Sequence, residues 1–459
     1  MEIVETGIEG LDELFLGGIL RGNMVLIDGP PGAGKTTFGL EFIYRGITQF
    51  DESGLVITCE QFPESIYRDA LNFGWHLRAL ERAGKLRVVC TSPELLLDAQ
   101  EGLVEEVARE IGARRIVVDS ISHFRNVISE PLALRQAIYS FCNGLRRLGL
   151  TAFLIKERDT GDGRSHNFEE YVVDTVIYLH NRSGDNWRKQ RKLEVVKSRG
   201  QEHIPGKHTF KISSSGIKIF TLKDPSRACP CAGESCRIPT GVAGLDEVTG
   251  GGFPPAISVG VYGSSGTGKT VLGLQFLVEG ARKYGEKGLY LSLEETPAQL
   301  FATADSFGWD LHALHEEKKV QVLYSSMVET DIDEMIVELG KLVQSTGIQR
   351  LVIDSPAGLF CQLQDPVLIR ERIYYLVRQL NNLGCTSLLL FPAMEESPVC
   401  SIAGSMMHGI ILLKSSLSHN RRFRYLEVYK LRGVNHVTGN HLMEINTSGI
   451  RVFPRIGGW

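Results

Sequence analysis

Two stretches of the sequence have the residue types and the spacing of a phosphate-binding loop. Gly29–Thr36 reads G-P-P-G-A-G-K-T and Gly263–Thr270 reads G-S-S-G-T-G-K-T, and both fit the pattern G-x-x-x-x-G-K-[ST]. Glycines let successive backbone N–H groups turn toward phosphates, and the N-terminus of a following helix adds the positive end of its dipole. The pattern therefore predicts two sites for the phosphates of a nucleotide.

The last residues of each loop have the side chains that such a site needs. We expect Lys35 and Lys269 to reach the β- and γ-phosphates, and the hydroxyls of Thr36 and Thr270 to bind Mg²⁺. The residues predicted to contact the nucleotide are Gly29, Gly32, Gly34, Lys35, Thr36, Thr37, Gly263, Gly266, Gly268, Lys269 and Thr270. A chance glycine-rich turn is the alternative for one loop, and the second copy of the motif argues against it.

An apolar run that ends in aspartate follows each loop. Arg115–Asp119 is the first, 84 residues beyond the loop lysine (119 − 35 = 84), and Arg350–Asp354 is the second. At this distance after a phosphate loop, the run has the Walker B pattern, whose carboxylate binds the water shell of Mg²⁺. We therefore predict that Asp119 and Asp354 belong to the two magnesium sites.

Carboxylates that could activate water follow another predicted strand in each half. They are Glu60, which precedes Gln61, and the pair Glu294-Glu295. A strand beside the phosphate loop would bring a terminal carboxylate to the edge of the sheet where the γ-phosphate lies. The alternative is a solvated glutamate at a strand end.

Matching residues in the two halves are separated by a nearly constant number of positions. The offset is 234 for the loop lysines (269 − 35) and for the glutamates (294 − 60), and 235 for the aspartates (354 − 119). It is 233 for Lys197 and Lys430 (430 − 197), each of which begins the motif K-x-R-G. A period of this length is far above that of a solenoid repeat and indicates a domain duplicated in tandem.

The apolar patterns around these motifs predict strands that alternate with helices. Met24–Ile27, just before the first loop, suits a buried strand. Helical spacing predicts single helices at Ser65–Ala79 and Pro93–Ile111, and two late antiparallel strands are predicted at Val172–His180 and Arg191–Val196. The alternation and the two phosphate loops favour the α/β class: two tandem P-loop NTPase domains, each with a mostly parallel sheet flanked by helices.

We place the domains at residues 1–222 and 237–459, with a linker at residues 223–236. The linker sequence C-P-C-A-G-E-S-C contains Cys229, Cys231 and Cys236. A zinc site usually takes four ligands in C-x₂-C pairs, whereas these three cysteines have other spacings and no close histidine. We expect free thiols, with a metal or redox role as the alternative.

The composition is that of an ordinary globular protein. In 459 residues, 43% are hydrophobic and 23% charged, which suits two or three domains. A net charge of −4 gives no broad basic surface for nucleic acid. No apolar run reaches the ~18–20 residues of a membrane span, and the first residues, MEIVETGIEG, do not resemble a signal peptide. We expect a cytoplasmic protein with reduced cysteines.

Taken together, the motifs resemble those of the KaiC family of RecA-like ATPases in its double-domain form. The resemblance rests on T-G-x-x-G-L-D segments at Thr6 and Thr240, the phosphate loops, the glutamates, the Walker B aspartates and the K-x-R-G motifs. It implies a double-layered homohexamer with ATP and Mg²⁺ between neighbouring subunits, and general bases at Glu60 and Glu294. It also implies that four cations reach the γ-phosphate of a neighbour's ATP: Lys197, Arg199, Lys430 and Arg432.

This sequence departs from the family pattern in three places. Gln61 stands where the second half has Glu295. Circadian KaiC proteins bind KaiA through a C-terminal tail, and this chain stops soon after its last predicted hairpin, so a KaiA-type partner is not expected. The family's phosphorylated Ser-Thr pair falls on Gly404 and Ser405, which leaves Ser405 as the candidate acceptor for serine/threonine autokinase activity, with Ser401 as the alternative.

Different classes of function remain open at this stage. The first is an ATPase with autokinase activity that acts as a switch toward an unidentified signalling partner. The second is a RecA/RadA-like, DNA-dependent ATPase of recombination, which needs a basic groove for single-stranded DNA. The third is a nucleotide-bound scaffold with little turnover. The acidic net charge and the two-ring plan that the resemblance implies count against the second.

Overall fold

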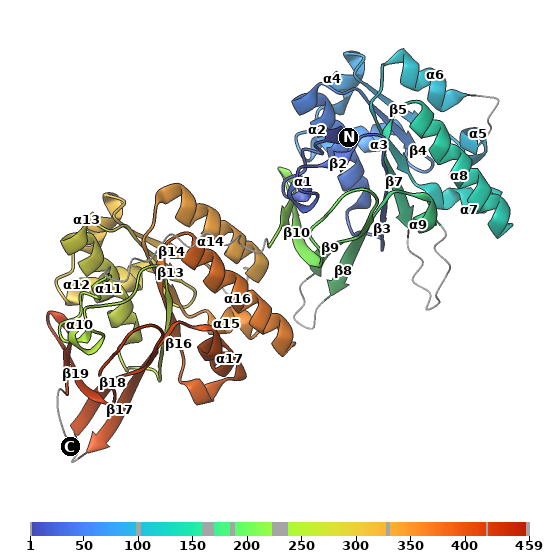
Figure 1. Cartoon of the computed structure of the whole chain (residues 1–459). Helices are drawn as coiled ribbons and strands as arrows, with labels where there is room; N and C mark the ends of the chain where they lie inside the picture. The colour runs from blue at the N-terminus through green and yellow to red at the C-terminus, as the bar shows by residue number, and fades with distance from the viewer. Residues whose placement is uncertain are drawn as a thin grey trace. The chain divides into compact units, whose positions relative to one another are not determined.

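The computed structural model of the chain describes residues 2–97, 102–157, 169–183, 189–222, 237–326, 331–418 and 421–455. The chain divides into two compact units, Met1–Lys223 and Asp224–Trp459. Each unit holds one sheet of nine strands with helices on both faces (Figure 1), which confirms the prediction of two tandem α/β domains. The predicted linker, residues 223–236, lies outside the described residues with its three cysteines.

The first sheet has the order β11-β10-β9-β8-β3-β7-β6-β4-β5. From β5 to β8 neighbouring strands are parallel, and from β8 to β11 they are antiparallel. The strands are β3 (Met24–Gly29), β4 (Gly54–Thr58), β5 (Leu86–Cys90), β6 (Arg115–Asp119), β7 (Thr151–Glu157), β8 (Thr175–Ser183), β9 (Lys189–Ser198), β10 (Lys207–Ser213) and β11 (Gly216–Phe220). A separate ribbon pairs β1 (Ile3–Val4) with β2 (Ile19–Leu20).

The helices of the first unit correct two sequence predictions. They are α1 (Leu11–Leu14), α2 (Lys35–Phe50), α3 (Pro63–Leu71), α4 (Leu77–Arg82), α5 (Pro93–Leu97), α6 (Leu103–Glu110), η1 (Ile121–His123), α7 (Phe124–Val127), α8 (Pro131–Arg147) and α9 (Glu169–Val172). The prediction of a single helix at Ser65–Ala79 is wrong, because α3 ends at Leu71 and α4 begins at Leu77, with Gly74 between them at φ +73°. The single helix predicted at Pro93–Ile111 is also wrong, because α6 begins only after Gly102, at φ +58°. Glycine adopts this left-handed conformation readily.

The second unit repeats the plan in the order β14-β13-β15-β16-β12-β17-β18-β19-β20. Its strands are β12 (Ser258–Gly263), β13 (Gly288–Ser292), β14 (Val320–Tyr324), β15 (Arg350–Asp354), β16 (Thr386–Phe391), β17 (Gly409–Ser418), β18 (Arg421–Leu431), β19 (His441–Asn446) and β20 (Gly449–Phe453). Its helices are α10 (Leu245–Val248), α11 (Lys269–Tyr284), α12 (Pro297–Ser306), α13 (Leu311–Glu316), α14 (Ile332–Thr346), α15 (Ala357–Phe360), α16 (Pro366–Asn382), η2 (Met394–Glu396) and α17 (Pro398–Met406). The helices that the structure describes are too short or too polar to cross a membrane.

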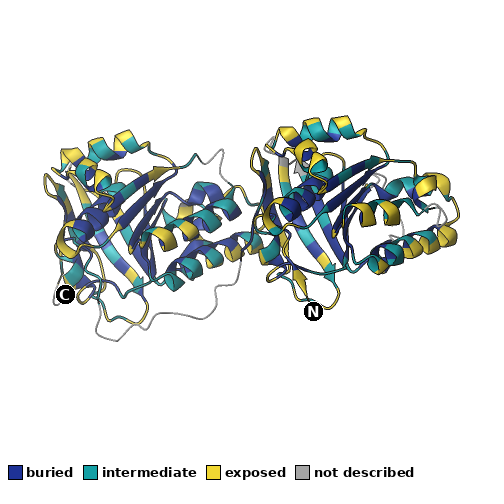
Figure 2. Cartoon of the chain, turned by 90° about the horizontal axis from the view of Figure 1, so that it is seen from above, coloured by how far each residue is buried: buried dark blue, intermediate teal, exposed yellow. Residues whose placement is uncertain are grey.

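Alternating residues of β3 enter two separate apolar clusters, one on each face of the sheet. Val25 and Ile27 join the cluster that contains Phe42 of α2, and Met24 and Leu26 join the cluster on the opposite face. This is the pattern expected of a strand buried on both sides. Figure 2 shows buried strands between helices whose outer faces are exposed. The strand that leads into the phosphate loop is therefore held firmly on both faces.

The repeated T-G-x-x-G-L-D segment folds around its aspartate. In the first unit, Asp12 accepts hydrogen bonds from the backbone N–H and the hydroxyl of Thr6, both at 2.7 Å. Asp246 accepts the matching pair from Thr240 at 2.7 and 2.6 Å. The motif thus stabilises a turn ahead of the strand that carries each phosphate loop, which accounts for its presence in both halves.

Candidate nucleotide sites

The first phosphate loop lies between β3 and the first turn of α2, as the motif requires. Lys35 Nζ donates to the carbonyl oxygens of Gly29 at 2.9 Å and Pro30 at 3.2 Å. A Cβ at Gly29 would lie 2.8 Å from the carbonyl oxygen of Leu179, and Gly34 has φ +102°. These positions therefore need glycine, and the loop leaves backbone N–H groups at a helix N-terminus, which is an anion site.

Each Walker B aspartate lies beside the loop threonine. Thr36 Oγ1 donates to Asp119 Oδ2 at 2.7 Å, and Thr270 Oγ1 donates to Asp354 Oδ2 at 3.1 Å. Burial raises the pKa of both carboxyls. A hydroxyl and a carboxylate oxygen next to a phosphate loop are the oxygen donors that Mg²⁺ uses, with phosphates and waters completing its shell. The residues present therefore fit Mg²⁺ at both sites.

The position of Glu60 corrects the sequence interpretation. Strand β4, which ends just before it, does not lie beside β3, because β6 and β7 run between them. The Glu60 side chain is 60% exposed, and its Oε1 lies 3.0 Å from His123 Nε2. Burial is the main cause of the raised pKa of Asp119, and the negative charge of Glu60 contributes to the same rise. Glu60 thus lies at the correct edge of the sheet, two strands further away than predicted.

Three carboxylates line a cleft at the second site. A cleft of about 540 Å³ is lined by Lys269, Thr270, Glu294, Glu295 and Asp354, among others. Burial raises the pKa of both glutamates, and the nearby Asp354 carboxylate raises it further. A carboxylate that holds its proton more tightly is a better proton acceptor.

Several residues near these sites were not found from the sequence. His123 contacts Glu60, and Tyr290 Oη donates to Asp354 Oδ2 at 2.6 Å. Arg424 and Ile445, from the late antiparallel strands, line the second cleft. No motif marks these four positions, because strand pairing rather than spacing along the chain brings them to the site. Thr37 lies in the first turn of α2, and its role stays a prediction.

In each unit, the K-x-R pair and the phosphate loop lie toward opposite ends of the strands. Lys197 pairs with Val176 near the start of β8, and Val176 pairs with Leu26 in the first half of β3. The loop follows the far end of β3, a six-residue strand that spans roughly 15–20 Å. Lys430 is placed in the same way, since its partner Ile410 pairs with Gly260 of β12. Neither pair is placed to reach its own loop.

Each pair donates hydrogen bonds to the last carbonyl groups of a short helix. Lys197 Nζ donates to the carbonyl oxygens of Glu170 at 2.6 Å and Val173 at 2.7 Å, and Arg199 donates to that of Tyr171 at 3.0 Å. In the second unit the acceptors, each at 3.4 Å, are the carbonyl oxygens of Gly404 for Lys430 and Ser405 for Arg432. Burial, then the adjacent arginine, lowers the pKa of both lysines.

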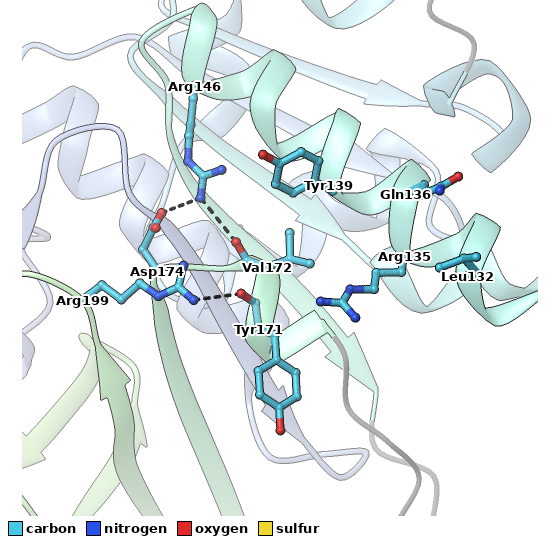
Figure 3. Close-up of a pocket in the computed structure, with 9 residues that line it drawn as sticks. All are labelled: Leu132, Arg135, Gln136, Tyr139, Arg146, Tyr171, Val172, Asp174 and Arg199. Atoms are coloured by element: carbon cyan, nitrogen blue, oxygen red, sulfur yellow. Dashed lines mark hydrogen bonds and ion pairs between the residues drawn. The ribbon is translucent and has the colours of Figure 1, made fainter.

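A hollow of about 460 Å³ lies beside Arg199 (Figure 3). Arg135 and Tyr139 line it from α8, and Tyr171 lines it from α9. The rings of Tyr139 and Tyr171 are 55% and 71% exposed. The guanidinium groups of Arg135, Arg146 and Arg199 and two exposed tyrosines are therefore gathered on this face of the first unit, a composition typical of the anchors of protein interfaces.

Ser405, the candidate phosphate acceptor, lies in the last turn of α17. Its side chain is exposed, and its hydroxyl donates to the carbonyl oxygen of Ile402 at 2.7 Å. The preceding Gly404 is buried, and a Cβ there would collide with the Met394 side chain. A second hydroxyl at position 404 would therefore require Met394 to move.

Comparisons with known proteins identify the same family in both units. The model of the family described as "ATPase: KaiC" matches residues 4–224 and 238–456. The circadian clock oscillator protein KaiC of Rippkaea orientalis is 30% identical over 466 residues, which cover 97% of this chain and 88% of the relative. That of Picosynechococcus sp. is 32% identical over 369 residues, 78% of this chain and 70% of the relative. The chain belongs to the KaiC family of ATPases.

Proposed function

We propose that this protein is a cytoplasmic, Mg²⁺-dependent ATPase that assembles into a homohexamer, phosphorylates Ser405 in its second unit and acts as a regulatory switch. The observation that carries the proposal is the separation of each K-x-R pair from the loop of its own unit. Because Lys197 lies near the start of β3 and the loop follows its far end, its ammonium can serve a γ-phosphate only on another subunit. ATP then binds between subunits.

Exposed apolar side chains support a head-to-tail contact between copies. Leu132, Tyr139 and Tyr171 surround the Arg199 side of the first unit, and Phe62, 72% exposed, follows Glu60 on the loop side. In the second unit Val367 of α16 is 73% exposed. Large apolar side chains at both edges suit a heterologous interface, and such interfaces close into rings when the rotation fits.

The residues divide the chemistry of hydrolysis between the two sides of the interface. Lys35 and Lys269 bind phosphate oxygens in their own loop, and Glu60 and Glu294 accept the proton of the attacking water. Mg²⁺, held by the threonine–aspartate pairs, supplies neutralisation of phosphate charge when it is bound. The neighbour's lysine and arginine stabilise the charge that develops on the transferred phosphoryl group.

Ser405 belongs to the same interface in this proposal. The backbone carbonyl of Ser405 is the acceptor for Arg432, so the serine lies beside a cation that would serve the neighbour's nucleotide. Glu294 and Glu295 supply carboxylates that can accept a hydroxyl proton as well as a water proton. A serine whose phosphate content follows ATP turnover fits the clock oscillator description of the relatives. The match to KaiC over both units favours this function over the DNA-dependent alternative.

A mixing experiment tests whether the sites are shared. One chain carries Lys35→Ala and the other carries Lys197→Ala with Arg199→Ala, and both carry Glu294→Gln to silence the second unit. Each chain alone should be inactive. The 1:1 mixture should recover about one quarter of the parent rate, because a random ring places an intact loop against an intact pair at one interface in four. Two inactive chains that stay inactive when mixed into rings would contradict the proposal.

A further inference from the structure

The first unit contains a buried cluster of charged side chains next to its phosphate loop. Lys156 of β7 pairs in register with Asp28 of β3, and its Nζ lies 4.0 Å from Asp28 Oδ2 and 3.1 Å from Glu169 Oε2. The three side chains are 5%, 1% and 3% exposed. Arg125 Nη2 lies 2.6 Å from the other oxygen of Glu169. We call Asp28, Lys156 and Glu169 the buried charge network.

The fold itself does not need these charges, because the second unit replaces them. Tyr262 and Phe391 occupy the register positions of Asp28 and Lys156, and their rings stack with centroids 5.0 Å apart. Ala403 takes the place of Glu169, since Arg432 contacts Ser405 where Arg199 contacts Tyr171 (405 − 171 = 234 and 169 + 234 = 403). Burying an ion costs several kcal/mol, and an apolar substitute is often as stable. The charges in the first unit therefore point to a role beyond stability.

The network joins the phosphate loop to the helix that holds the cations of the K-x-R pair. Asp28 immediately precedes Gly29, where the loop begins, and Glu169 is the first residue of α9. Lys197 and Arg199 donate to backbone carbonyl groups of α9 and of the residue that follows it (Figure 3 shows the Arg199 contact). A four-residue helix has little stability of its own, so its position depends on its contacts, which include these two anchors and the burial of Val172.

A second contact ties the same helix to the same strands. Tyr178 of β8, which pairs in register with Asp28, donates its hydroxyl to Glu170 Oε1 at 2.6 Å. The corresponding positions in the second unit are Leu412, opposite Tyr262, and Gly404, which cannot form this bond. Among the described residues, the contacts of Glu169 with Lys156 and of Glu170 with Tyr178 thus occur in the first unit and have no equivalent in the second.

We infer that the buried charge network makes Glu169 a positioning residue for Lys197 and Arg199. The strand that carries the phosphate loop in one subunit then fixes the position of the two cations that this subunit extends toward its neighbour. This rests on the proposed sharing of sites between subunits. Removing one member leaves a buried charge without its partner, and α9 then shifts with its carbonyl groups. A displacement of about 1 Å at groups that contact the transition state can cost roughly 100-fold in rate.

The mixing experiment described above separates this role from a general folding defect. The donor chain (Lys35→Ala) supplies only the K-x-R pair, and the acceptor chain (Lys197→Ala with Arg199→Ala) supplies only the loop. Glu169→Gln in the donor should lower the recovered kcat by about 10- to 100-fold, with the KM for ATP unchanged. The same substitution in the acceptor, whose own pair is already removed, should leave the recovered rate within about twofold.

A graft from the second unit guards against variants that fail to fold. Asp28→Tyr, Lys156→Phe and Glu169→Ala together copy the uncharged set, and the donor that carries them should still assemble and yet lose the same 10- to 100-fold in kcat. A grafted or Glu169→Gln donor that supports the full recovered rate would overturn the inference. So would an equal loss from Glu169→Gln in the acceptor. Absence of recovery with the parent pair would instead contradict the shared sites themselves.

Discussion

Tyr290 donates its buried hydroxyl to Asp354 Oδ2 at 2.6 Å, the same oxygen that accepts from Thr270. The contact arises because β13 and β15 are neighbours, with Tyr290 opposite Val352. In the first unit Val56 holds this place opposite Val117, so Asp119 lacks a tyrosine donor there. The two Walker B carboxylates, which match in sequence, therefore differ in how strongly their ionised form is stabilised.

Tyr290→Phe should shift the pH dependence of the second unit. Burial raises the pKa of Asp354, and the hydrogen bond from Tyr290 opposes this rise. Without the hydroxyl the pKa rises further, so the ionised form that Mg²⁺ needs is lost at a higher pH as the solution is acidified. In a Glu60→Gln background, the acid limb of the rate of phosphate release should move to higher pH.

Tyr262→Phe is the matched control for this variant. It also removes a buried tyrosine hydroxyl from the second unit, but that hydroxyl does not contact Asp354. Its acid limb should stay at the parent position. Equal shifts in the two variants would show that packing, and not the bond to Asp354, sets the pH dependence.

Glu41→Gln should stabilise the first unit at alkaline pH. Burial raises the pKa of Glu41 from 4.5 to about 7, although it accepts a bond from the backbone N–H of Ile217 at 2.7 Å. The folded state holds this proton more tightly than the unfolded state, so its stabilising effect is complete below pH 4.5 and is lost as the pH rises through about 7. The gain in unfolding free energy should grow by about 2 kcal/mol between pH 5 and pH 8.

The second unit supplies the control, because Gln275 accepts the equivalent bond from Ile450. Gln275→Glu should introduce the same alkaline loss of stability into that unit. Calorimetry at pH 5 and pH 8 measures both effects. A Glu41→Gln gain that is equal at the two pH values would mean that Glu41 is ionised in the folded state throughout this range.

Glu60→Gln and Glu294→Gln should each suppress hydrolysis in their own unit and leave nucleotide binding intact. A positioned general base contributes about 10²–10⁴-fold, so the double variant should release almost no phosphate. Rapid filtration with labelled ATP checks binding, and phosphate release checks turnover. If the double variant hydrolyses ATP at the parent rate, the bases lie elsewhere. Glu157 is then the next candidate in the first unit, because its charge raises the pKa of Asp119, and Glu295 is the next in the second unit, because it lines the cleft.

Incubation with Mg²⁺ and ATP should add one phosphate to the peptide that contains Ser405. The exposed hydroxyl lies at the helix end that Arg432 contacts, whereas Gly404 offers no acceptor. Ser405→Ala and Lys269→Ala should each abolish the added mass, and Ser401→Ala serves as the control that keeps it. Phosphate retained in Ser405→Ala would assign the acceptor elsewhere, and no added phosphate in the parent chain would leave an ATPase alone.

The sequence was sufficient for the strands that carry the motifs but not for their neighbours in space. Apolar runs such as Met24–Ile27 mark buried strands, and the repeat shows that the same plan occurs twice. Strand order is not encoded in chain order, so the insertion of β7 and β6 between β3 and β4 was missed. The contacts of His123 and Tyr290 were missed for the same reason, since each depends on which strand ends lie together.

The placement of loop and cations toward opposite ends of the strands also bears on what happens when sound and defective chains are made together. In the proposed ring every chain takes part in two interfaces, as loop donor in one and as cation donor in the other. A chain that lacks both Lys35 and the Lys197–Arg199 pair would silence the first-unit sites on both of its sides, although it contributes only one first-unit loop itself. We therefore expect such a chain to act as a dominant inhibitor whose effect exceeds its share of the population.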